Sequence, residues 1–312
     1  MAKTSSTPAH NTQTVSGLIF NVMRFALNDG AGIRTTVFLK GCPLNCRWCH
    51  NPESQSYSPE ILYSIDRCLR CRDCCEACES GALLWEDGPV RDSSRCTLCE
   101  KCIEACPAEA RKLIGKHISV QELMDVISRD QVFYEQSQGG ITFSGGEPLA
   151  QAEFLELALQ ACQAKGFRTA VDTSGYATPA VLRRIAKVTD EFLFDLKMMD
   201  DSKHRWFVGV SNEIILRNLA FLAREHPNVK VRIPVIPGVN DDAVNLEESC
   251  RFLERLGLRA VDLLPYHEIG VEKYKRMGTA YDMDSIKPPN ADRMMEIAAE
   301  YAARGFEVSI GG

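Results

Sequence analysis

Three cysteines, Cys42, Cys46 and Cys49, follow one another at spacings of four and three residues. Thiolates at these spacings can occupy three corners of a cubic iron–sulfur cluster, and the surrounding segment supplies no fourth cysteine. One iron of such a cluster stays open to a small chelating substrate, as one position of a catalytic zinc does. The alternatives are a structural metal knuckle and a cysteine-rich turn without metal.

Nine further cysteines lie between residues 57 and 111, and eight of them form two runs of the same spacing, C-x2-C-x2-C-x3-C. This is the spacing of bacterial two-cluster ferredoxins, in which the fourth cysteine of each run ligates the other cluster. We therefore expect two four-iron clusters, one on Cys68, Cys71, Cys74 and Cys106 and one on Cys96, Cys99, Cys102 and Cys78. A zinc module of C-x2-C pairs is the alternative, although a zinc ion needs only four ligands.

The remaining three of the fourteen cysteines stand outside these spacings. Cys162 and Cys250 lie in helical patterns and are expected to be small buried apolar residues. Cys75 adjoins a predicted ligand and could compete with it, and Glu79 follows Cys78 where proline is usual. Because eleven cysteines have metal-ligand spacings, we expect a reducing compartment rather than a disulfide scaffold.

The overall charge excludes a general polyanion-binding surface. The 312 residues include 36 basic and 42 acidic ones, a net charge of −6, which disfavours nucleic acid as a partner. No apolar run approaches the roughly 20 residues of a membrane span. Residues 1–16 are polar and lack the apolar core of a signal peptide, so we expect a disordered leader on a cytoplasmic protein.

Strand and helix patterns alternate along the rest of the chain. Strands are predicted at 35–40, 140–144, 168–171, 192–196, 229–236, 260–264 and 306–310, and helices at 120–127, 154–164, 179–188, 244–256 and 290–304. This alternation predicts parallel βαβ units, and six of them without a GxGxxG turn favour an α/β fold of the partial (β/α)6 TIM-type barrel. Residues 17–56 and 112–312 would form the barrel, with 57–111 as an inserted ferredoxin-like domain.

Polar or glycine-rich segments follow each of the first six strands, where barrels place their chemistry. After the cysteine loop come the residues Gly145, Gly146, Glu147, Asp172, Thr173, Ser174, Asp195, Lys197, Arg232 and His267. Taken singly, Gly145-Gly146 would be an ordinary turn and Asp172-Thr173-Ser174 a helix N-cap. Asp195 with Lys197 would be an ion pair, and Arg232 and His267 would be satisfied polar residues. Their occurrence in order at successive strand ends favours one shared site.

These motifs together resemble the radical S-adenosylmethionine superfamily, through the cysteine loop with Trp48 before its last cysteine and through Gly145-Gly146-Glu147-Pro148. Five further segments are similar to the glycyl radical enzyme activating enzymes within it: 29–34, 48–52, 172–175, 195–197 and 265–267. Ala31 stands where that family usually has proline. The insertion resembles that of members serving diol dehydratases, choline trimethylamine-lyase and arylacetate decarboxylases.

The resemblance implies an enzyme that reductively cleaves S-adenosylmethionine to a 5'-deoxyadenosyl radical. The radical would abstract hydrogen from a backbone glycine in the C-terminal loop of a partner enzyme. The family's cofactors would be three four-iron clusters, S-adenosylmethionine and a monovalent cation, with a reductant of the flavodoxin or ferredoxin type. Choline trimethylamine-lyase is one expected partner.

By the same resemblance, the strand-end residues divide the cofactor between them. Gly145, Gly146 and Glu147 would hold its methionine amino end. Asp172, Thr173 and Asp195 would contact the ribose or the cation, with Ser174 and Trp48 beside them. Polar groups of the cofactor would meet Lys197 and His267, and the carboxylate or the incoming peptide would meet Arg232.

Two other functions are compatible with parts of this sequence. A radical S-adenosylmethionine enzyme could act on another peptide or a small molecule, although such maturases usually carry auxiliary cysteines near the C-terminus, and here none follows Cys250. A non-catalytic ferredoxin-like electron carrier would leave the Cys42 loop and the strand-end motifs unexplained, and it would not cleave S-adenosylmethionine.

Overall fold

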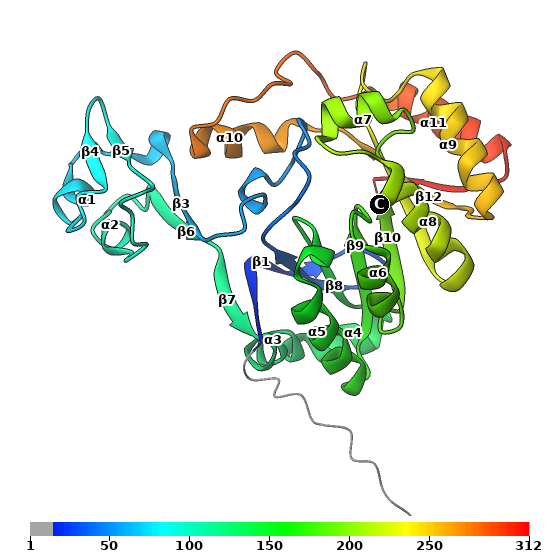
Figure 1. The fold of residues 1–312 in the computed structure, drawn as a ribbon, viewed down its shortest axis with the longest axis horizontal. Coiled ribbons are helices and arrows are strands. Elements are labelled where there is room, and N and C mark those ends of the chain that lie inside the picture. The colour runs from blue at the N-terminus through cyan, green and yellow to red at the C-terminus, as the bar shows by residue number, and fades with distance from the viewer. Residues whose placement is uncertain (1–14, 312) are drawn as a thin grey trace, which may run out of the picture.

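The computed structural model describes residues 15–311, and most of them belong to an α/β unit built on one large sheet (Figure 1). Its nine strands are ordered β13-β12-β11-β10-β9-β8-β2-β1-β7 within the described residues. Seven of them run parallel: β2 (Arg34–Leu39), β8 (Gly140–Gly145), β9 (Arg168–Thr173), β10 (Glu191–Asp195), β11 (Val229–Val235), β12 (Ala260–Pro265) and β13 (Glu307–Ile310). The mostly parallel sheet that the alternation predicts is thus confirmed.

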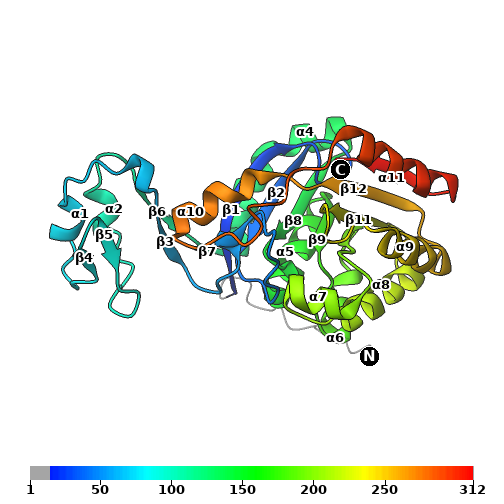
Figure 2. The same cartoon turned by 90° about the horizontal axis from the view of Figure 1, so that it is seen from above.

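Helices cover the outer side of the parallel sheet (Figure 2). They include α3 (Val120–Ile127), α5 (Ala152–Ala164), α6 (Pro179–Ala186), α8 (Glu213–Glu225), α9 (Ala243–Leu256) and α11 (Ala291–Ala303). Ser119 caps the N-terminus of α3, because its hydroxyl accepts from the Glu122 N–H while the Glu122 carboxylate accepts from the Ser119 N–H. Nearly every residue of β2 and β8 is buried, as expected for strands covered on both faces.

Two antiparallel strands at one edge were absent from the sequence prediction. β1 (Ser16–Ala26) pairs with β2 through two register shifts, and β7 (Lys116–Ser119) pairs with the start of β1. The predicted leader lies outside the described residues except for Val15 and Ser16, and Ser16 already begins β1. No helix within residues 15–311 is both long and apolar enough to span a lipid bilayer.

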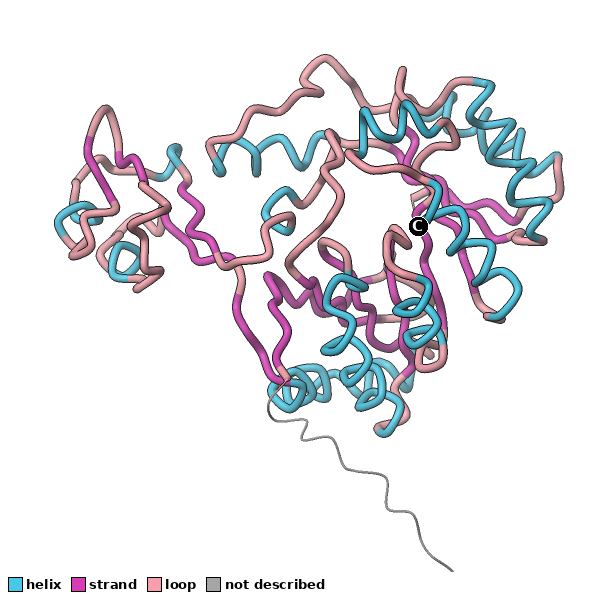
Figure 3. Tube along the Cα trace, in the orientation of Figure 1, coloured by secondary structure: helices cyan, strands magenta, loops and turns pink. Residues whose placement is uncertain are grey.

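A small lobe stands apart from the sheet (Figure 3). It holds the hairpin of β4 (Leu83–Trp85) and β5 (Pro89–Arg91) and two four-residue helices, α1 (Asp73–Glu76) and α2 (Lys101–Glu104). Its connection to the sheet is an antiparallel ribbon of β3 (Glu60–Tyr63) and β6 (Arg111–Ile114), which extends beyond the predicted boundary at residue 111. Buried Lys40, directly after β2, ties the ribbon to the sheet through Glu60 at 2.8 Å.

Three other helices complete the described chain: α4 (Gln131–Ser137), α7 (Asp201–Val208) and α10 (Val271–Met277). Among them, α10 lies against β3 and against the short 3-10 turn Pro52–Ser54 that follows the cysteine loop. Its Lys273 ammonium pairs with the Glu53 carboxylate at 2.7 Å and donates to the Asn51 side chain at 2.6 Å. The C-terminal flank of the cysteine loop is therefore held by a segment more than 200 residues away in sequence.

Candidate functional site

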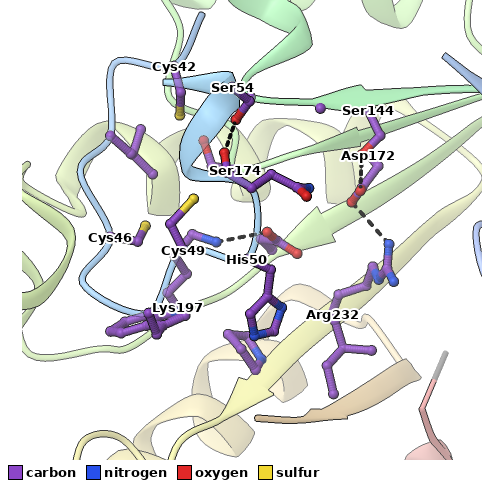
Figure 4. A pocket seen from close by; sticks show the side chains of 18 of the residues that line it. Cys42, Cys46, Cys49, His50, Ser54, Ser144, Asp172, Ser174, Lys197 and Arg232 are labelled. Atoms are coloured by element: carbon purple, nitrogen blue, oxygen red, sulfur yellow. Dashed lines mark hydrogen bonds and ion pairs between the residues drawn. The ribbon is translucent and has the colours of Figure 1, made fainter. Parts of the chain in front are cut away.

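A cavity of about 640 Å³ lies at the carboxyl ends of the parallel strands. Most of the predicted strand-end residues line it together with the cysteine loop: Cys42, Cys46, Trp48, Cys49, Gly145, Gly146, Asp172, Ser174, Asp195, Lys197, Arg232 and His267 (Figure 4). Residues separated by up to 225 positions therefore share one pocket. This is the arrangement that parallel strands impose, because their carboxyl ends meet at one edge of the sheet.

The cysteine loop is fixed by backbone hydrogen bonds rather than by its thiols. The N–H groups of Asn45 and Arg47 donate to carbonyls at the end of α7, each at 2.9 Å. Trp48 is 5% exposed and packs on Phe207 of the same helix, with ring centroids 6.3 Å apart. The loop is thus preformed, and its three sulfur atoms are free to bind a cluster.

Burial raises the pKa of all three loop thiols, that of Cys49 to about 12. Without metal they are neutral at pH 7, and iron must replace their protons. Within residues 15–311, no three His, Cys, Asp or Glu side chains are grouped so that they could hold a single metal ion.

Two ion pairs are formed by residues that line the pocket. The Arg232 guanidinium lies 3.2 Å from one carboxylate oxygen of Asp172, and the other oxygen accepts a hydrogen bond from the Ser144 hydroxyl at 2.6 Å. The Lys197 ammonium lies 2.8 Å from the Asp195 carboxylate. Burial alone lowers the pKa of Lys197 and Arg232, but the facing carboxylates outweigh it and the pKa of each is raised. Both cations therefore keep their charge, and the pocket presents alternating charges to a zwitterionic ligand.

Two glycines bring backbone against the cysteine loop. Gly145 has φ +122°, and a Cβ there would lie 2.2 Å from the Leu39 carbonyl oxygen. A Cβ on Gly146 would lie 2.5 Å from the Gly41 carbonyl oxygen. No other residue fits at either position without moving the strand that carries the loop.

Glu147 is not among the residues that line the cavity, and its carboxylate is bonded to neighbouring backbone and hydroxyl groups. It is fully buried and accepts from the Thr173 hydroxyl at 2.6 Å, the Ser174 N–H at 2.9 Å and the Leu149 N–H at 3.0 Å. Burial raises the pKa of Glu147, and these donors oppose the rise. The Thr173 hydroxyl is turned the same way, so both residues join strand ends instead of lining the cavity.

Replacing Glu147 by alanine should lower the free energy of unfolding by at least about 2 kcal/mol, because three or more buried donors lose their acceptor. Urea unfolding of the anaerobic protein measures the loss. Glu225→Ala, at the exposed end of α8, is the matched control and should change it by less than about 0.5 kcal/mol. Equal midpoints for the two variants would contradict a structural role for Glu147.

Several lining residues were not predicted as site residues, among them His50, Ser144 and Asp29. His50 stacks on His267 with ring centroids 3.9 Å apart and an interplanar angle of 19°. Burial, followed by the nearby His267 and Lys197, lowers the pKa of His50 to about 4, so its ring is neutral. The signal that could have found His50 is its position directly after a loop cysteine.

Three buried nitrogen atoms at the pocket have no hydrogen-bond partner within the described residues: His50 Nε2, His267 Nδ1 and Arg232 Nε. Buried polar groups rarely remain unpaired without a ligand or water. Together with three thiols and two charged pairs, they fit a polar ligand bound beside an iron–sulfur cluster, and the donor set thus suits the group expected from sequence.

In the small lobe, the two cysteine runs have matching backbones. Left-handed residues recur 28 positions apart, at Arg70 and Leu98 (φ 58° and 54°) and at Arg72 and Glu100 (φ 75° and 62°). Two cavities follow the predicted exchange of the fourth cysteine. One is lined by Cys68, Cys71, Cys74 and Cys106, and the other by Cys78, Cys96, Cys99 and Cys102.

Comparison with known proteins gives consistent results. Residues 95–252 match the sequence profile of the Radical SAM superfamily. The chain is 44% identical to the trans-4-hydroxy-L-proline dehydratase activating enzyme of Clostridioides difficile, over 95% of this chain and 99% of that protein. It is 39% identical to the choline trimethylamine-lyase activating enzyme of Oleidesulfovibrio alaskensis, over 94% and 97%. SuiB of Streptococcus suis, solved with its precursor peptide SuiA, shares the fold at a TM-score of 0.50 and 12% identity, over 87% of this chain and 46% of that one.

Proposed function

The chain belongs to the glycyl radical enzyme activating enzymes of the radical S-adenosylmethionine superfamily, and from this premise we propose which of its residues carry the reaction and which serve electron transfer. As a member it is an enzyme that activates a partner glycyl radical enzyme, using a four-iron cluster and S-adenosylmethionine. When bound, the cluster supplies the electron that cleaves S-adenosylmethionine, and the resulting 5'-deoxyadenosyl radical abstracts hydrogen from the partner's glycine.

The observation that carries the assignment of residues is the convergence of the cysteine loop and the strand ends on one cavity. Cys42, Cys46 and Cys49 would hold the cluster, which would supply the electron and a binding point for S-adenosylmethionine. The backbone at Gly145 and Gly146 lies against the loop and receives the methionine amino end. Glu147 follows Gly146 directly, and its carboxylate helps to position this backbone by accepting hydrogen bonds from the Ser174 and Leu149 N–H groups.

The charged pairs orient the rest of the cofactor. Lys197 and Arg232 are fixed cations, suited to the methionine carboxylate and to a carbonyl of the incoming peptide. Asp172 and Asp195 already have cationic partners, so we assign them to ribose hydroxyls instead of a monovalent cation. His50 and His267 offer neutral imidazole nitrogens to the cofactor's remaining polar atoms.

We propose that the fold is a partial (β/α)6 barrel of residues 17–56 and 112–312, with the lobe as a ferredoxin-like insertion. The matched left-handed turns and the two four-cysteine cavities support two auxiliary four-iron clusters in the lobe. These clusters would relay electrons from a flavodoxin or ferredoxin type reductant to the cluster on Cys42, Cys46 and Cys49.

The identity of the partner does not follow from overall similarity, because relatives at 44% and 39% identity serve a dehydratase and a lyase. Trans-4-hydroxy-L-proline dehydratase and choline trimethylamine-lyase are therefore the first two partners to test. Each is prepared with α-deuterated glycine and mixed anaerobically with the reduced enzyme and S-adenosylmethionine.

A cognate partner should give a glycyl radical signal in electron paramagnetic resonance and deuterium in the 5'-deoxyadenosine. If strong release of 5'-deoxyadenosine without deuterium were found with every glycyl radical enzyme tried, that result would contradict glycine abstraction. It would instead favour a radical enzyme acting on another peptide or a small molecule.

A further inference from the structure

Arg111 is a buried cation in the small lobe. It begins β6 and lies opposite Tyr63, the last residue of β3, with its guanidinium carbon 4.9 Å from the centre of the tyrosine ring. Only 4% of the residue is exposed. The side chain is therefore held in place by the ribbon, with one face of the guanidinium covered by an aromatic ring.

The guanidinium lacks the acceptors that a buried charge requires. Its Nε and Nη2 atoms have no hydrogen-bond partner among residues 15–311, and no carboxylate in that part of the chain forms an ion pair with Arg111. Burying a charge without a partner costs several kcal/mol. A bound group that accepts hydrogen bonds, and preferably one that carries negative charge, would remove this cost.

The cavity beside Arg111 identifies that group by its other lining residues. They include Cys68, Cys71, Cys74 and Cys106, the four thiols assigned to one auxiliary cluster. A four-iron cluster with four thiolates is an anion whose sulfur atoms accept hydrogen bonds. Arg111 lines the same cavity, so the guanidinium with unpaired N–H groups belongs to the wall of the space where such a group would sit.

The second cluster cavity has a different arginine in its lining, the partly exposed Arg91, and no cation at the position equivalent to Arg111. The two halves of the lobe repeat every 28 residues, so the position five residues after Cys106 corresponds to the position five residues after Cys78. That position is Leu83, which is 6% exposed and lines the second cavity with Cys78, Cys96, Cys99 and Cys102. One half therefore places a guanidinium where the other half places an isobutyl group.

We propose that Arg111 donates its free guanidinium N–H groups to the cluster held by Cys68, Cys71, Cys74 and Cys106 and raises the reduction potential of that cluster above that of the other auxiliary cluster. The inference rests on the proposed auxiliary clusters. Reduction adds one negative charge to a cluster, and a fixed cation with two donors stabilises the reduced form more than the oxidised form. The cluster beside Arg111 is then the first of the two auxiliary clusters to be reduced.

The test uses redox titration of the full chain, followed by electron paramagnetic resonance. Cys42, Cys46 and Cys49 are all replaced by alanine in the background, so that only auxiliary clusters contribute to the signal. Arg111→Leu copies the residue of the other half, and Arg111→Gln keeps an N–H donor without the charge. Lys112→Met removes an exposed cation next to Arg111 in β6 that lines neither lobe cavity.

Arg111→Leu and Arg111→Gln should each lower the reduction potential of one auxiliary cluster. For the leucine variant we expect the reduction equilibrium to change about tenfold, which corresponds to about 59 mV for a one-electron couple. In both Arg111 variants, the potential of the other auxiliary cluster and the iron content should match the background protein. In Lys112→Met, both potentials should match it. Unchanged potentials in an iron-replete Arg111 variant would overturn the proposal, as would equal falls in both. Loss of iron from both Arg111 variants would also overturn it, in favour of a structural role.

Iron counted in the wild-type protein distinguishes this proposal from the one on which it rests. Iron for three four-iron clusters satisfies the premise before any titration is made. Iron for a single cluster would overturn both the auxiliary clusters and the role of Arg111, while cleavage of S-adenosylmethionine would still test the main site.

Discussion

Replacing Cys46 by alanine is expected to reduce cleavage of S-adenosylmethionine to the rate seen without protein. Cys46 lies between Asn45 and Arg47, whose N–H groups anchor the loop to α7, so the substitution removes a sulfur atom and leaves the loop backbone in place. Two thiolates cannot hold a cubic cluster with one open iron, and without that cluster no electron reaches the cofactor.

The measurement is 5'-deoxyadenosine released by anaerobically reconstituted and reduced protein. Cys162→Ala makes the same chemical change at a fully buried cysteine of α5 that lines neither the main cavity nor the two lobe cavities, and it should release nucleoside as the wild type does. Normal release by the Cys46 variant would refute the assignment of the cluster to this loop.

Replacing Cys99 by alanine is expected to remove about four iron atoms, one cluster's worth, and to spare the cluster on Cys42, Cys46 and Cys49. Cys99 lines the second lobe cavity, and the β3–β6 ribbon connects the lobe to the main sheet. Loss of a ligand in the lobe therefore leaves the main pocket intact.

Iron analysis and cleavage of S-adenosylmethionine by a chemical reductant, measured on one sample, test this independence. The matched control is Cys75→Ala, because Cys75 adjoins Cys74 but lines neither lobe cavity, and it should keep the full iron content. A Cys99 variant without any iron would show that the sites do not form independently.

The parallel strands could be predicted because their signal is local and strong. Segments such as Thr35–Leu39 and Phe192–Asp195 are apolar or β-branched runs bounded by turn residues, and the structure confirms them within one or two positions. β7 has only four residues, and β1 carries exposed apolar side chains and two register shifts. Neither strand shows the periodicity that marks a strand in sequence.

The site was predictable as a set but not in its orientations. Strand order alone brings Asp172, Asp195 and Arg232 together, because β9, β10 and β11 are neighbours. The direction of the Glu147 side chain depends on donors from Thr173 and Ser174, which are 26 and 27 residues away. The stacking of His50 on His267 joins segments more than 200 residues apart, and no local pattern encodes it.

Quantifying 5'-deoxyadenosine and iron in one anaerobic sample tests the central claim most directly. The wild-type protein is reconstituted, reduced and supplied with S-adenosylmethionine. We expect nucleoside release from protein that holds iron for three four-iron clusters. Full iron without any nucleoside would contradict the account and would indicate a ferredoxin-like electron carrier instead of an activating enzyme.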